Sequence, residues 1–321
     1  MKNFVTKTAL VFATMFAVNT ISAQPQDMGF GGFQFNEVKL DCADKIADVN
    51  YAGDDQAYHT CDIYIPKQGK KPFPVVIHIY GSAWFSNNSK GMADISTIVK
   101  ALLEAGYAVV TPNHRSSMDA KFPAQINDIK AVVRFVRGEA KKYGFDTKFI
   151  ATSGFSSGGH LASLTATTSG IKEGKIGNVT IDLEGNIGNY TKLSSSVNAA
   201  CDWSGPIDLL NMDCGGKRAD GASGPEEALL GCKADENMDL YRSLSPISYI
   251  DKNDPPLIVF HGKKDNVVPC CQGQELYDNL KNAGVKTDLT LVEEGGHGFN
   301  MYSDENLKKM VDFLNSARKK K

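Results

Sequence analysis

One serine stands in a sequence context that could make it a nucleophile. The segment Gly154-Phe155-Ser156-Ser157-Gly158 has the spacing G-x-S-x-G and lies between an apolar, β-branched run and a stretch of small residues. Where a strand turns into a helix at a single residue, that residue is strained, and side chains two positions away on either side would collide. The two glycines avoid this collision, so the pattern predicts that the Ser156 hydroxyl is raised above the edge of a sheet.

A serine hydroxyl needs a general base, and neutral histidine is the usual one. His297 lies in a Gly-rich segment after the last predicted strand, at residues 293–298. The chain order serine, acid, histidine places the base in that segment. The other five histidines are expected to pack within strands, near strand ends or at the start of a helix: His59, His78, His114, His160 and His261.

The acid that orients this histidine has two candidates. Asp265 follows the strand predicted at Leu257–His261 and precedes His297, whereas Asp202 ends the preceding strand. A carboxylate in this role holds the imidazole in the correct tautomer and stabilises the imidazolium. We predict that Asp265 is the acid and keep Asp202 as the alternative.

Acyl transfer also needs N–H donors placed for an oxyanion. One donor is expected to be the N–H of Ser157, at the start of a helix, where N–H groups are free. Others are expected from the loop after the strand Val75–Tyr80, where Gly81 and Ser82 let the backbone approach a substrate. Two tryptophans next to these segments are predicted to contact the substrate: Trp84 and Trp203.

These residues need a sheet to position them. Apolar, β-branched runs alternate with helical patterns, which indicates an α/β fold with a mostly parallel central sheet and helices on both faces. The expected strands are Cys61–Ile65, Val75–Tyr80, Ala108–Thr111, Phe149–Ser153, Val197–Trp203, Leu257–His261 and Thr287–Val292. The expected helices are Asp94–Ala105, Ala124–Lys142, Ser157–Thr167, Cys271–Asn282 and Glu305–Ala317.

Two segments interrupt this alternation. Gly170–Leu193 is rich in Gly and Asn and is predicted to be an excursion or hairpin over one end of the sheet. Asp213–Ser245 contains several glycines and then a short helix near Glu226–Leu230. Insertions at the carboxyl ends of strands commonly shape substrate pockets. We therefore expect the second segment to form a pocket wall beside Ser156.

The composition is that of a globular protein. The chain has 321 residues, of which 42% are hydrophobic and 22% charged, with a formal net charge of −2. Disorder, collagen and coiled coil are excluded, and without a basic field nucleic acid is not an expected partner. No linker or repeat divides the chain, so residues 24–321 are predicted to form one catalytic domain.

The amino-terminal residues have the pattern of a secretory signal peptide. Lys2 and Lys7 precede an apolar run from Ala9 to Val18, and the small residue Ala23 follows. The run is about ten residues long, whereas a spanning helix needs about 20. We predict cleavage after Ala23 and a secreted or periplasmic protein without a stable membrane anchor; the alternative is an anchored form.

Seven cysteines follow the predicted leader, an odd number, so at least one is free or pairs outside the chain. Cys214 and Cys232 bracket a Gly-rich segment and are the first choice for a disulfide that stiffens it. Cys42 with Cys61 is the second choice, and unpaired thiols are the alternative to both. No C-x-x-C motif with histidine partners occurs, so no zinc site is expected.

Together, these motifs resemble the alpha/beta-hydrolase esterases related to the hormone-sensitive lipase group. Within that group the nearest branch is the bacterial feruloyl and acetyl esterases that act on decorated plant polysaccharides. The similarity extends from about Val38 to Ala317. It rests on the segments at residues 79–84, 112–115, 122–125, 154–162, 202–206, 228–231, 245–249, 254–269 and 296–299.

The sequence departs from this family in the oxyanion loop. Tyr80 stands where the family usually has histidine, and Ser82 and Ala83 replace glycines. In the elbow, Ser157 stands where alanine is commoner. Backbone N–H groups survive these changes, so the changes bear on loop geometry and substrate range.

The resemblance implies a secreted serine carboxylesterase with the triad Ser156, His297 and Asp265 and no cofactor or metal. Its expected substrate is a small-molecule or oligosaccharide ester, such as an acetylated or feruloylated saccharide. Two alternatives are a serine peptidase of the same fold and a non-catalytic carbohydrate-binding relative. Such peptidases usually carry a large extra amino-terminal domain, and a non-catalytic relative would have lost a triad residue.

Overall fold

The computed structural model describes residues 40–215 and 224–319. The predicted signal peptide, residues 1–23, lies outside the described residues, as does part of the predicted pocket wall, residues 216–223. From Asp41 onward the chain clusters into one unit.

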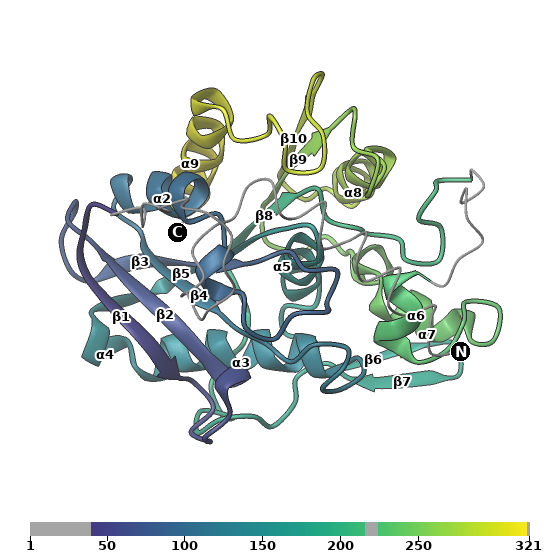
Figure 1. Ribbon diagram of the computed structural model, residues 1–321, viewed down its shortest axis with the longest axis horizontal. Coiled ribbons are helices and arrows are strands. Elements are labelled where there is room, and N and C mark those ends of the chain that lie inside the picture. Colours follow the sequence, from purple (N-terminus) through teal and green to yellow (C-terminus); the bar gives the residue numbers. More distant parts are fainter. Residues whose placement is uncertain (1–39, 216–223, 320–321) are drawn as a thin grey trace, which may run out of the picture. The chain divides into compact units, whose positions relative to one another are not determined.

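A mostly parallel sheet forms the centre of this unit (Figure 1). Within the described residues it has eight strands in the order β1-β2-β4-β3-β5-β8-β9-β10. The pairs β1–β2 and β2–β4 are antiparallel, and all other neighbours are parallel. The strands are β1 (Cys42–Asn50), β2 (Thr60–Pro66), β3 (Phe73–Ile79), β4 (Ala108–Pro112), β5 (Phe145–Phe155), β8 (Ala199–Trp203), β9 (Leu257–Gly262) and β10 (Thr287–Val292).

Helices cover both faces of the sheet. Helices α2 and α9 contact each other and pack on one face, whereas α3 and α5 contact each other and pack on the other (Figure 1). The helices are α2 (Lys100–Glu104, continuing a π-helical turn at Ile95–Val99), α3 (Ala124–Gly138), α4 (Ala140–Tyr143), α5 (Ser157–Thr167), α6 (Pro225–Leu230), α7 (Met238–Leu244), α8 (Cys271–Asn282) and α9 (Asp304–Arg318). This is the architecture of an alpha/beta hydrolase.

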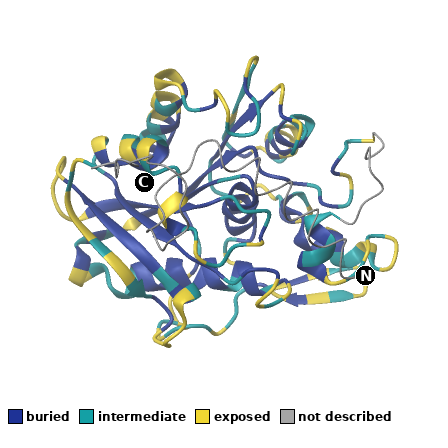
Figure 2. Cartoon of the chain, in the orientation of Figure 1, coloured by how far each residue is buried: buried dark blue, intermediate teal, exposed yellow. Residues whose placement is uncertain are grey.

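The core lies between the sheet and these helices. All residues of β3, β4, β8 and β9 are buried, whereas those of the edge strand β1 are exposed or half-buried (Figure 2). Four apolar residues at helical spacing on α3 are fully buried: Ile126, Ile129, Val133 and Val136. Burial of such a stripe is what stabilises a helix of this length, because isolated helices are marginal in water.

The first interruption of the alternation is a hairpin, as predicted. Strand β6 (Glu173–Ile176) pairs antiparallel with β7 (Val179–Asp182). Gly177 in the turn has a φ of +55°, in the left-handed region that glycine adopts most readily. The hairpin contacts α7, a helix that was not predicted from the sequence.

A strand and a helix differ from the predictions. Strand β1 was not predicted because its mostly exposed residues lack an apolar alternation. The helix predicted at Ala124–Lys142 divides at Gly138, where the ring of Tyr190 packs so closely that a Cβ would lie 2.3 Å from it.

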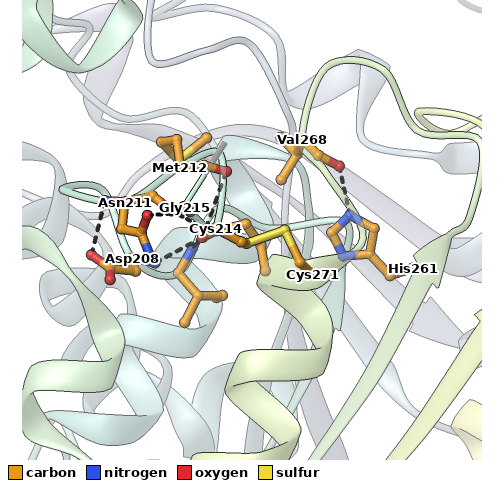
Figure 3. The surroundings of a disulfide bond; sticks show 10 residues. Asp208, Asn211, Met212, Cys214, Gly215, His261, Val268 and Cys271 are labelled. Carbon is orange, nitrogen blue, oxygen red and sulfur yellow. Dashed lines mark hydrogen bonds between the residues drawn. A yellow bond between two sulfur atoms is a disulfide. The ribbon is translucent and has the colours of Figure 1, made fainter. Parts of the chain in front are cut away.

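The predicted disulfide between Cys214 and Cys232 is wrong. Cys214 is bonded to Cys271, the first residue of α8, and their Cα atoms lie 6.3 Å apart (Figure 3). Gln272 accounts for this pairing: its side chain accepts the N–H of Ile207 at 2.7 Å and donates to the carbonyl of Asn211 at 3.1 Å. These bonds draw the chain after β8 toward α8.

The second-choice disulfide is also absent. Cys42 and Cys61 are both free because they lie at opposite ends of the β1–β2 ladder, where Cys42 faces Pro66 and Cys61 faces Val49. Cys232 is free as well.

Candidate active site

The nucleophile elbow has the geometry that its glycines predict. Ser156 lies between β5 and α5 with φ 55° and ψ −124°, a strained conformation for a residue with a side chain. A Cβ on Gly154 would lie 2.2 Å from the carbonyl oxygen of Gly158, and one on Gly158 would lie 2.1 Å from that of Ile79. Only glycine fits at either position, so these backbone contacts fix the turn.

Three side chains from separate loops meet at this turn. Ser156 Oγ lies 2.9 Å from His297 Nε2, and His297 Nδ1 lies 2.8 Å from Asp265 Oδ2. The side chain of His297 is 9% exposed and that of Asp265 is fully buried. A neutral histidine in this arrangement accepts the serine proton on Nε2 and donates from Nδ1 to the carboxylate.

Two neighbouring loops hold the acid against the base. Strands β9 and β10 are parallel neighbours, so the loops that follow them leave the same edge of the sheet. The N–H of Lys263 donates to the carbonyl of Val292 at 2.9 Å, and that of Lys264 donates to Gly295 at 2.8 Å. Gly262 permits this approach, because a Cβ there would lie 2.3 Å from the Gly295 carbonyl oxygen.

The environment of Asp265 keeps its carboxylate ionised. Burial would raise the pKa of Asp265, but the hydrogen bond from His297 and the backbone donors hold it below its usual value. Oδ1 accepts the N–H groups of Val267 and Val268, each at 2.9 Å. His261 steadies this loop, since its Nε2 lies 2.8 Å from the Val268 carbonyl oxygen. An ionised, fixed acceptor of this kind can orient His297.

The alternative acid lies elsewhere. Asp202 is fully buried at the end of β8. Its carboxylate accepts hydrogen bonds from the Ser163 hydroxyl at 2.5 Å and from the N–H of Gly205 at 2.7 Å. Burial raises its pKa to about 6. Because the hydrogen bond of His297 goes to Asp265, the geometry favours Asp265 over Asp202 as the partner of the base.

The loop after β3 reaches the elbow, as its small residues suggest. A Cβ on Gly81 would lie 2.8 Å from Ser156 Cβ, so glycine is needed for this approach. The N–H of Ser82, expected to face a substrate, instead donates to Ser157 Oγ at 2.8 Å. Among the described residues, no acceptor is paired with the N–H of Ser157 or Ala83. Those two N–H groups are therefore free to bind an oxyanion.

Trp84 does not offer a surface to the substrate, contrary to the prediction. Its side chain is 2% exposed, and its indole N–H donates to His160 Nδ1 at 3.3 Å. Burial lowers the pKa of His160 to about 4, so the ring is neutral and can accept this bond. Ala83 and Trp84 both have positive φ angles, 49° and 60°. Trp84 thus anchors a strained loop instead of contacting a ligand.

Trp203 is likewise a packing residue. Its side chain is 0% exposed, and its ring stacks on Phe260 with centroids 4.0 Å apart. Its carbonyl accepts the N–H of Ser156 at 2.8 Å. The prediction that its side chain contacts substrate is therefore replaced by a supporting role beneath the nucleophile.

Two side chains at the site were not predicted to take part in it. The Phe155 ring packs against that of His297, with the ring centroids 4.7 Å apart. The Ser157 side chain bridges the elbow and the loop after β3. The G-x-S-x-G pattern accepts any residue at the position of Phe155, so the pattern offers no reason to select it. Serine is common at the start of a helix, so the side chain of Ser157 was not singled out either.

No group of three His, Cys, Asp or Glu side chains in residues 40–215 and 224–319 could hold a metal ion. No helix in these ranges is long and apolar enough to cross a membrane.

Comparison with known families identifies the chain's relatives. The model of the BD-FAE family matches residues 61–280, more than half of the chain. The chain belongs to the BD-FAE family. The match includes the elbow and Asp265, and ends within α8 before His297. Membership agrees with the resemblance to alpha/beta-hydrolase esterases inferred from the motifs.

Curated relatives of this BD-FAE chain are named as esterases. Esterase LipQ of Mycobacterium tuberculosis is 30% identical over 216 residues, 67% of this chain and 47% of LipQ. The probable carboxylic ester hydrolase LipM of the same organism is 30% identical over 65% of this chain and 45% of LipM. The chain spans about half the length of these relatives.

Solved structures of closer sequence are also similar to this chain. A truncated carbohydrate esterase from gut microbiota is 43% identical with a TM-score of 0.85, covering 88% of this chain and 99% of that one. A bifunctional GH43-CE protein of Bacteroides eggerthii is 48% identical with a TM-score of 0.82, covering 88% of this chain and 36% of that one.

Proposed function

We propose that this chain is a serine carboxylesterase that removes acyl groups, acetyl or feruloyl, from plant polysaccharides or oligosaccharides. One observation carries the proposal: Ser156, His297 and Asp265 are joined by two hydrogen bonds, at 2.9 and 2.8 Å, on a strained elbow. The similarity to a carbohydrate esterase and to a GH43-CE protein, at 43% and 48% identity, supports a saccharide ester as the substrate.

The geometry suits a two-step acyl transfer. Ser156 Oγ attacks the ester carbonyl carbon while its proton passes to His297 Nε2, and the carbonyl electron pair moves onto oxygen. When the tetrahedral intermediate collapses, the alcohol leaves with the proton from His297. Water then attacks the acyl-enzyme by the same route, releasing the acid and restoring Ser156. Asp265 stays ionised and stabilises the imidazolium formed in each step.

We also propose that the protein acts outside the cytoplasm. The support is the signal-peptide pattern of residues 1–23, together with a polysaccharide substrate that cells meet outside. Amino-terminal sequencing of the exported protein is expected to begin at Gln24; a start at Met1 in exported material would contradict cleavage.

A substrate panel tests the activity. We expect the purified protein to hydrolyse some of p-nitrophenyl acetate, p-nitrophenyl butyrate, methyl ferulate and acetylated xylan, and their relative rates define the acyl group and the alcohol. Ser156→Ala is expected to lower the rate by about 10⁴–10⁶-fold, since loss of a triad member removes the nucleophile. Its melting temperature should stay close to that of the unmodified protein. Retention of more than a few percent of turnover would rule out Ser156 as the nucleophile.

A further inference from the structure

The hydroxyl of Ser157 holds a position that the triad does not explain. Ser157 begins α5 directly after the nucleophile, and its residue is 1% exposed. Its Oγ lies 2.8 Å from the backbone nitrogen of Ser82. The hydroxyl therefore bridges the two chain segments that carry the candidate oxyanion donors.

The direction of this hydrogen bond is fixed by its partners. A backbone N–H can only donate, so Ser157 Oγ is the acceptor. The proton of the Ser157 hydroxyl then remains to be donated, and no acceptor for it is found among the described residues. A buried polar hydrogen without an acceptor is unusual in a folded protein and calls for a partner.

The position of the hydroxyl indicates what that partner is. Gly81 brings the loop after β3 so near the elbow that a Cβ would lie 2.8 Å from Ser156 Cβ. Ser82, the next residue of this loop, holds Ser157 Oγ, and the free N–H of Ser157 belongs to the same residue as the hydroxyl. The unused donor thus lies beside the atoms where negative charge develops when Ser156 attacks a carbonyl.

We propose that the Ser157 hydroxyl is an oxyanion donor that takes the place of the Ser82 N–H. The Ser82 N–H donates to Ser157 Oγ, and the Ser157 O–H donates to the developing oxyanion, beside the N–H of Ser157. Hydrogen bonds in such a chain strengthen one another, because an oxygen that accepts a bond becomes a better donor. The inference rests on the proposed esterase function and adds a catalytic residue to it.

The oxyanion donors then differ from those expected from the sequence. Ser82 contributes through a side chain on another segment instead of contacting the oxyanion itself. The loop that carries it is fixed independently by Trp84, whose indole N–H is bound to His160 and whose carbonyl accepts the N–H of Ser117 at 2.8 Å. Removing the hydroxyl should therefore leave the loop in place.

A pair of substrates that differ in one atom tests the donor role. An ester and its thionoester react at the same carbon, but sulfur accepts hydrogen bonds more weakly than oxygen. In Ser157→Ala we expect kcat/KM for the ester to fall about 10²-fold, the usual cost of one oxyanion donor. The ratio of ester to thionoester rates is expected to fall about tenfold or more, because the lost bond matters less to sulfur.

Two further variants separate donation from structure. Ser157→Thr keeps a hydroxyl and is expected to keep the rate ratio within about threefold. Thr165→Val is the matched control on α5: the buried Thr165 hydroxyl donates to the Leu161 carbonyl at 2.7 Å, so its loss should leave the ratio unchanged.

The possible outcomes are distinguishable. Equal losses on both substrates in Ser157→Ala would mean a structural role, and an unchanged or higher ester rate would mean that the hydroxyl donates nothing; either result overturns the inference. If Ser157→Ala does not fold, a rate ratio in Ser157→Thr that falls to a tenth overturns it, and a retained ratio supports it. An unmodified protein that hydrolyses no ester would instead overturn the proposed function.

Discussion

The nucleophile elbow and the segment that follows β8 leave the same sheet and are held in different ways. The elbow is fixed by close backbone packing, because a Cβ on Gly154 would collide with the carbonyl oxygen of Gly158, and one on Gly158 with that of Ile79 on β3. The segment after β8 is fixed by α8, which follows it by more than 50 residues, through hydrogen bonds of the Gln272 side chain. The Cys214–Cys271 disulfide also joins the two (Figure 3).

Because the two regions are held differently, substitutions in them should affect different properties of the protein, namely activity and folding stability. A substitution in the elbow or in the loops that meet it changes the proposed catalytic groups. It should have little effect on stability, because many other contacts hold the fold together. A change at the disulfide removes a constraint between residues separated by 57 positions, which acts on the unfolded chain as well as on the native one. We therefore expect activity and stability to respond to different substitutions.

The largest expected effect is at the acid. Asp265→Asn removes the charge that accepts the His297 Nδ1 proton, and the amide favours the wrong tautomer of the ring. We expect kcat to fall about 10⁴-fold on any ester that the protein hydrolyses, equivalent to about 5 kcal/mol in activation free energy. Steady-state kinetics and a thermal melt together measure the effect. A loss of less than tenfold would show that Asp265 is not the acid.

The second effect is on the other region and concerns stability. Replacing Cys214 and Cys271 by serine opens a loop of 57 positions, which the chain-entropy model values at about 4 kcal/mol of unfolding free energy. Urea unfolding of the oxidised protein and of the double variant measures the difference. The free Cys232 gives the control, since Cys232→Ser is expected to change stability by less than about 0.5 kcal/mol.

Peptide mapping of the unreduced, exported protein checks the pairing itself. A Cys214–Cys271 peptide should be recovered, with Cys232 and Cys270 alkylated as free thiols. Recovery of Cys214 joined to Cys232 or Cys270 would contradict the structure and remove the basis of this comparison.

The sequence predicted most of the parts whose cause is local. Steric need for glycine around Ser156, the apolar stripe of α3 and the order of serine, acid and histidine are all expressed within short windows of residues. The mostly parallel sheet and the helices on both of its faces follow from the alternation of patterns. The edge strand β1 was not predicted, because it is mostly exposed and its residues do not alternate between apolar and polar.

The parts with distant causes could not be predicted. The partner of Cys214 depends on Gln272, which draws the chain toward α8 from 58 residues away. The burial of Trp84 depends on His160, 76 residues along the chain. No spacing rule connects such residues, because their proximity is a property of the folded sheet and its crossings.

The smallest expected effect is a change in stability at Asp202. This residue lies on β8, just before the second region, and was the alternative to Asp265 as the acid. Its folded pKa is raised from 3.8 to about 6, so the folded state holds its proton more tightly than the unfolded state. Between pH 4 and 6 this group makes the free energy of unfolding fall as pH rises, and above pH 6 the full loss of stability remains.

The variant Asp202→Asn tests this. Its side chain carries no charge and can still accept a hydrogen bond from Gly205 and donate one to Ser163. We expect it to gain about 1–3 kcal/mol at pH 8, little at pH 4, and to keep near-normal activity. Urea unfolding at both pH values measures this. Equal stability changes at the two pH values would contradict the raised pKa, and an activity loss as large as that of Asp265→Asn would move the acid to Asp202.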